Sequence, residues 1–85
     1  MNCEKIKNAI IVLDWMLNQL KEIMMNFENK DFRDVLHRAY HESIYGEWTL
    51  PEIVEKLCDI RRKIDILRMM VMAYAWKEKC LVTKE

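Results

Sequence analysis

Two long segments of this chain repeat large apolar residues at alternating steps of four and three positions. The first repeat comprises Ile6, Ile10, Leu13, Leu17, Leu20, Met24 and Phe27, and the second comprises Ile53, Leu57, Ile60, Ile64, Leu67, Val71 and Tyr74. Residues three and four positions apart lie on the same face of an α-helix, so each repeat predicts a helix with one apolar seam. A seam of this kind packs against another helix, and the pattern therefore predicts an all-α protein.

The composition agrees with a small number of long elements. The 85 residues are enough for one domain, and they contain one glycine and one proline, which leaves little turn chemistry for a sheet of hairpins. We expect helices at about residues 4–27, 32–45 and 50–81. The predicted architecture is a three-helix bundle with two long helices and a short middle helix, all within a single domain spanning residues 1–85.

Local signals mark the expected helix ends. Asp31 or Asn29 can cap the middle helix by accepting a hydrogen bond from a free backbone N–H group. Gly46, the only glycine, stands where a left-handed residue would end that helix. Thr49 and Glu52 have the spacing of a capping box, which predicts the start of the third helix.

The last helix is apolar on all sides between residues 69 and 76, and an all-round apolar helix must be surrounded by protein. If neighbouring helices are antiparallel, the last helix extends past the end of the first by about 25 Å. We therefore predict self-association into a dimer or larger helical bundle. The expected contact residues are Leu67, Met69, Met70, Val71, Met72, Tyr74, Trp76 and Trp15. Alternatively, the middle helix lies across the other two, which then form an antiparallel hairpin with wide apolar faces.

Charge and cysteine usage narrow the possible partners. Lys and Arg total 14, as do Asp and Glu, so no global field attracts the chain to nucleic acid or anionic lipid. No apolar segment reaches the roughly 18 residues that span a bilayer. Cys3, Cys58 and Cys80 are odd in number and widely spaced, which predicts reduced thiols in a cytoplasmic protein.

Two histidines are the first candidates for chemistry. His37 and His41 are four residues apart, so their imidazoles can face one metal ion. No third histidine completes a closed site, and the pair lacks the order of residues found in helical metalloproteases. They remain weak metal candidates, and the sequence predicts neither a cofactor nor a catalytic residue.

A second group of residues suggests ligand binding. Aromatic and basic side chains near the turn before the last helix could hold a small ligand or nucleotide at a subunit boundary. The residues are Tyr40, His41, Tyr45, Trp48, Arg61 and Arg62. A weaker alternative is nucleic-acid binding through paired basic segments of the last helix.

The sequence as a whole favours a non-enzymatic function. We expect a small oligomeric helical interaction module that binds another protein as an adaptor or inhibitor. Small Met-rich chains of this type are frequent among bacterial and phage accessory or regulatory proteins, which is an argument by analogy.

Overall fold

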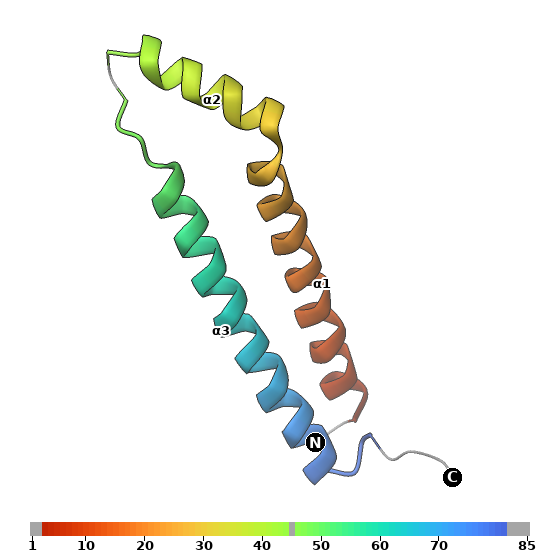
Figure 1. Ribbon diagram of the computed structural model, residues 1–85. Coiled ribbons are helices and arrows are strands. Elements are labelled where there is room, and N and C mark those ends of the chain that lie inside the picture. The colour runs from red at the N-terminus through yellow and green to blue at the C-terminus, as the bar shows by residue number, and fades with distance from the viewer. Residues whose placement is uncertain (1–2, 45, 82–85) are drawn as a thin grey trace.

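A computed structural model describes residues 3–44 and 46–81 of the chain. The described residues form three helices, which are α1 (Cys3–Glu28), α2 (Lys30–Glu42) and α3 (Leu50–Lys77) (Figure 1). The prediction of an all-α protein with two long helices and a short middle one is confirmed.

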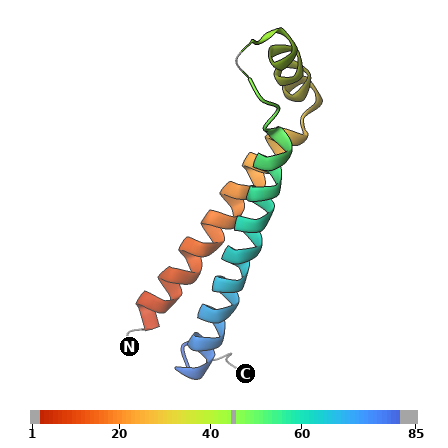
Figure 2. The ribbon, with the colours of Figure 1, turned by 90° about the vertical axis from the view of Figure 1, so that its left-hand side faces the viewer.

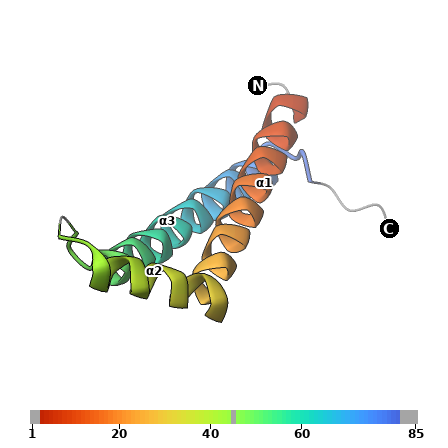
Figure 3. The ribbon, with the colours of Figure 1, turned by 90° about the horizontal axis from the view of Figure 1, so that it is seen from above.

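The two long helices form an antiparallel hairpin, and α2 lies across its upper end (Figures 1 and 2). Among the described residues, α2 has close backbone contacts with α1 and none with α3. A single chain therefore forms the hairpin alternative and not a closed three-helix bundle. The molecule is elongated, with extents of 60 × 20 × 16 Å. Seen from above, α1 and α3 diverge toward α2 (Figure 3).

The first connection is a single residue, Asn29, whose side-chain oxygen accepts a hydrogen bond of 3.0 Å from the backbone N–H of Phe32. This is the expected cap of α2. The second connection differs from expectation. α2 ends at Glu42, and Gly46 has no positive φ. Thr49 precedes α3 in a helical conformation and makes no capping hydrogen bond with its side chain, so the predicted capping box is wrong.

α3 ends four residues earlier than expected, at a well-defined stop signal. The backbone N–H of Cys80 donates to the carbonyl of Ala75 (2.8 Å), and that of Lys79 donates to the carbonyl of Trp76 (3.0 Å). These two bonds make a Schellman motif, which requires a residue in the left-handed conformation just after the C-cap of the helix. Lys79 supplies it with a φ of 59°, although glycine is the residue that adopts this conformation without steric cost.

Replacing Lys79 with glycine is expected to stabilise the protein by about 0.5–1 kcal/mol. The left-handed conformation costs a residue with a Cβ roughly 1–2 kcal/mol, and the greater freedom of glycine in the unfolded chain offsets part of the gain. Urea unfolding followed by circular dichroism measures the difference. Lys79→Ala, which keeps the Cβ, is the matched control, and an equal gain in both variants would contradict this explanation.

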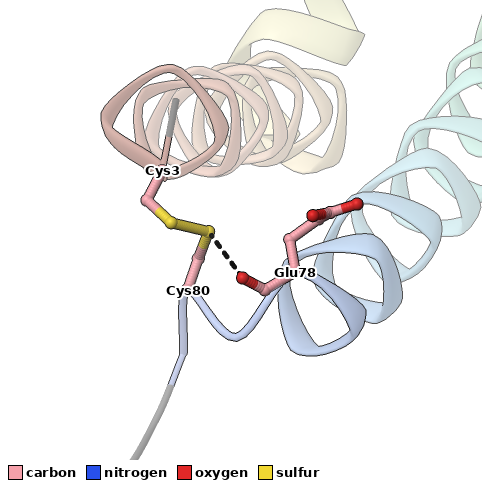
Figure 4. Close-up of a disulfide and its surroundings, with 3 residues drawn as sticks. All are labelled: Cys3, Glu78 and Cys80. Atoms are coloured by element: carbon pink, nitrogen blue, oxygen red, sulfur yellow. Dashed lines mark hydrogen bonds between the residues drawn. A yellow bond between two sulfur atoms is a disulfide. The ribbon is translucent and has the colours of Figure 1, made fainter. Parts of the chain in front are cut away.

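A disulfide joins Cys3, the first residue of α1, to Cys80, just beyond α3 (Figure 4). The Sγ atom of Cys80 also lies 3.7 Å from the carbonyl oxygen of Glu78. The expectation of three reduced cysteines is therefore wrong for this pair, while Cys58 is free and exposed. The expected overhang of about 25 Å is wrong as well, because the disulfide holds the end of α3 level with the start of α1.

Candidate functional site

The hairpin has a thin core. Among the described residues, five apolar side chains are buried, and three of them cluster at the disulfide end of the hairpin. These five are Ile6, Leu50, Ile64, Ala75 and Cys80. Many large apolar side chains on both long helices remain exposed, so the principal feature of this molecule is apolar surface that its own chain leaves uncovered.

The apolar seam of α3 divides into two rows. Leu57, Ile64 and Val71 are spaced seven residues apart and are buried or half-buried. The other row also repeats every seven residues and is more exposed, at 39%, 45%, 50% and 37% of each side chain. Its members are Ile53, Ile60, Leu67 and Tyr74. The first row packs toward α1, and the second lies on the flank of the hairpin.

An ion pair between Asp14 of α1 and Arg68 of α3 shows which side of each helix lies on the same face of the hairpin. Each helix turns by about 100° per residue, so Met16 lies across the α1 seam from Asp14. By the same rotation, Leu67 lies across the α3 seam from Arg68. Because Asp14 and Arg68 meet on one face of the hairpin, Met16 and Leu67 share the opposite face.

The face that contains Met16 and Leu67 continues along the hairpin. The Cys3–Cys80 bond and the Asp14–Arg68 pair define the register of the two helices. In that register three residues of α1, spaced by seven, lie level with three residues of α3, also spaced by seven. We call these six residues the apolar face: Ala9, Met16 and Ile23 on α1, with Tyr74, Leu67 and Ile60 on α3.

The structure separates the contact residues that the sequence grouped together. Leu67 and Tyr74 belong to the apolar face, and Met70 borders it one turn from each. Val71 and Met72 are half-buried in the hairpin. Met69, Trp76 and Trp15 are exposed on other sides of the two helices. Ala9, Met16, Ile23 and Ile60 were not among the expected contact residues, although their seven-residue spacing is visible in the sequence.

The residues expected to bind a small ligand are also separated. The rings of Tyr40 and Trp48 have centroids 5.3 Å apart, and His37 contacts Trp48 at 5.0 Å and His41 at 4.6 Å. Tyr45 lies outside the described residues. Arg61 and Arg62 line a hollow together with Lys21 of α1, and none of these aromatic rings belongs to its lining.

An apolar hollow lies beneath α2. Its volume is about 310 Å³, and its walls come from the end of α1, the underside of α2, residues 43 and 46–49 of the connection and the start of α3. The main apolar lining residues are Phe27, Phe32, Leu36, Tyr40, Trp48 and Ile53. The rings of Phe27 and Phe32 are 5.7 Å apart, so two aromatic pairs contribute to the walls.

The basic stretch of α3 is partly neutralised by neighbouring carboxylates. Asp59 pairs with Lys63 and with Arg62, each at 2.9 Å. Hydrogen bonds from Lys63 and then Arg62 hold the pKa of the Asp59 carboxyl below its usual value. These pairs weaken the case for phosphate binding. In the part of the chain that the structure describes, no three His, Cys, Asp or Glu side chains are grouped so that they could hold a metal ion.

Within residues 3–44 and 46–81, no helix has the length and apolar character needed to cross a membrane. No family model, no curated protein and no solved structure matches the chain.

Proposed function

We propose that this protein is a non-enzymatic helical interaction module that self-associates through its apolar face and binds another protein as an adaptor or inhibitor. The observation that carries the proposal is the apolar face itself. It contains no charged residue among its six members, and on α3 its side chains remain between 37% and 50% exposed in the single chain.

The exposed area supports a partner of substantial size. The chain exposes 7332 Å², whereas a compact monomer of 10.4 kDa exposes about 5,400 Å². The difference, about 1,900 Å², exceeds the roughly 800 Å² that each partner buries in a standard interface. The radius of gyration, 18.8 Å, also exceeds the value of about 12 Å expected for a compact domain of this length.

The spacing of apolar residues on α1 supports a second helical hairpin as the partner. Each heptad of α1 has two seam residues and one residue of the apolar face, for example Leu13, Leu17 and Met16. Three apolar positions per heptad give a stripe wide enough for neighbours on two sides, as each helix has in a four-helix bundle. Two copies packed face to face would make that bundle. Each copy has a formal net charge of zero, so no net electrostatic repulsion opposes the association of two copies.

Light scattering during size-exclusion chromatography tests the proposal at micromolar concentration. We expect a mass of two or more chains, with little dependence on salt, because the contact is apolar. A mass of one chain throughout the concentration range would reject self-association.

A further inference from the structure

The apolar side of α2 is only partly covered, by Phe27 of α1 and by Trp48. Phe32, Leu36 and Tyr40 follow one another at four-residue steps and line the hollow beneath the helix. No residue of α2 is buried, and α2 stands off α3. An amphipathic helix normally presses its apolar stripe against a core, whereas this stripe is covered in part and leaves a hollow beside it.

The hollow has the size of a small-molecule site. Its 310 Å³ corresponds to about ten molecules of liquid water, and binding pockets for small ligands begin near 300 Å³. Most of its lining side chains are aromatic or aliphatic, so water inside the hollow has few hydrogen-bonding partners. An apolar ligand that displaces this water gains free energy.

The charge of the lining specifies the ligand further. Among the described residues that line the hollow, Glu47 alone is charged, and it carries a carboxylate. An anionic ligand such as a nucleotide would meet this carboxylate and no cation among the described lining residues. Arg33 lines two neighbouring hollows that share Trp48 with this one, and Arg61 and Arg62 line a hollow between α1 and α3. A cationic ligand would be attracted both by the carboxylate and by the aromatic rings of Tyr40 and Trp48.

We propose that the hollow binds an organic cation with an apolar body, of the arylammonium or quaternary alkylammonium class. The apolar body lies between Phe32, Tyr40 and Trp48, and the ammonium group lies toward Glu47. This site shares no residue with the apolar face, and it lies at the α2 end of the hairpin, where Ile53 continues the row of Ile60 by one heptad. Loss of one function therefore leaves the other measurable.

The test uses phenyltrimethylammonium as the probe and the 85-residue chain with its native sequence. Heteronuclear NMR follows the Trp48 indole N–H, assigned by comparison with a Trp48→Phe variant. We expect saturable shifts of this signal with phenyltrimethylammonium. The neutral isostere tert-butylbenzene should bind without dependence on Glu47, and benzenesulfonate should bind more weakly than either.

Glu47→Gln is expected to weaken phenyltrimethylammonium binding by about fourfold to fifteenfold, the effect of one charge about 5 Å away at a partly solvated site. Glu22→Gln, which removes an exposed carboxylate of α1 that does not line the hollow, is the matched control and should change nothing. Trp48→Leu keeps an apolar wall but removes the aromatic ring, and it should also weaken binding of the cation. The proposal is overturned if the Trp48 signal does not saturate, if benzenesulfonate binds as tightly, or if Glu47→Gln has no effect in a chain whose spectrum shows it folded.

Discussion

Replacing both Cys3 and Cys80 with serine is expected to lower the free energy of unfolding by about 4–5 kcal/mol. The disulfide closes a loop with a sequence separation of 77, and a cross-link of this length removes much of the freedom of the unfolded chain. Domains of this size have a total stability of about 4–13 kcal/mol. The bond therefore accounts for a large share of what holds the hairpin together, as the thin core requires.

Urea unfolding monitored by circular dichroism measures the loss, and Cys58→Ser is the matched control because Cys58 is exposed and unbonded. The native protein treated with reductant should unfold at the same urea concentration as the double variant. If the double variant and Cys58→Ser have the same midpoint as the native chain, the disulfide does not contribute to stability.

The disulfide also bears on where the protein resides. Structural disulfides persist in oxidising compartments and are rare in the cytoplasm, which was the location expected from the sequence. The redox midpoint of the Cys3–Cys80 pair measures whether this bond would also persist in the cytoplasm. A midpoint below about −300 mV would keep the bond closed against the glutathione pool. A higher midpoint would mean that a cytoplasmic chain carries two thiols at this end of the hairpin.

Leu67→Glu is expected to dissociate the self-associated form. Leu67 lies in the middle of the apolar face, and an unpaired carboxylate buried there costs at least about 3 kcal/mol per copy. A two-fold dimer contains the substitution twice, so the dimer should weaken by about ten-thousandfold. The isolated hairpin should stay folded, because Leu67 is 50% exposed and leucine and glutamate have similar helix propensities.

Met69→Glu provides the matched control. Met69 lies two residues away on the same helix and is 62% exposed, but it faces the opposite side. Light scattering and sedimentation should show single chains for Leu67→Glu and the native mass for Met69→Glu. If both variants dissociate, the partner contacts α3 on both sides. If both variants keep the native mass, the apolar face is not the interface. Val71→Glu is less informative, because Val71 is half-buried within the hairpin.

The helices could be predicted because their signals are local. The seven-residue repeats define α1 and α3, and the cap at Asn29 was one of two alternatives that the sequence offered. The connection between α2 and α3 was less predictable. Its path from the end of α2 back to Leu50 depends on where α2 lies, so Gly46 and Thr49 do not adopt the conformations that their residue types favour.

The grouping of the candidate ligand residues failed for a related reason. Arg61 follows Leu50 by about 16 Å along a helix, which separates it from the aromatic rings at Tyr40 and Trp48. The Cys3–Cys80 pairing was equally hidden, since residues 77 apart meet only when the two long helices adopt one particular register.

Helix formation and periodicity depend on neighbours within a few residues, so the helical nature of this chain and the apolar positions on each helix follow from its amino-acid order. How those positions are used depends on contacts between the helices. The rotation of α3 about its own axis is set by its packing on α1, and that rotation buries Ile64 while leaving Leu67 on an open face. Whether an apolar residue belongs to the core or to an interface is therefore decided by the partner helix.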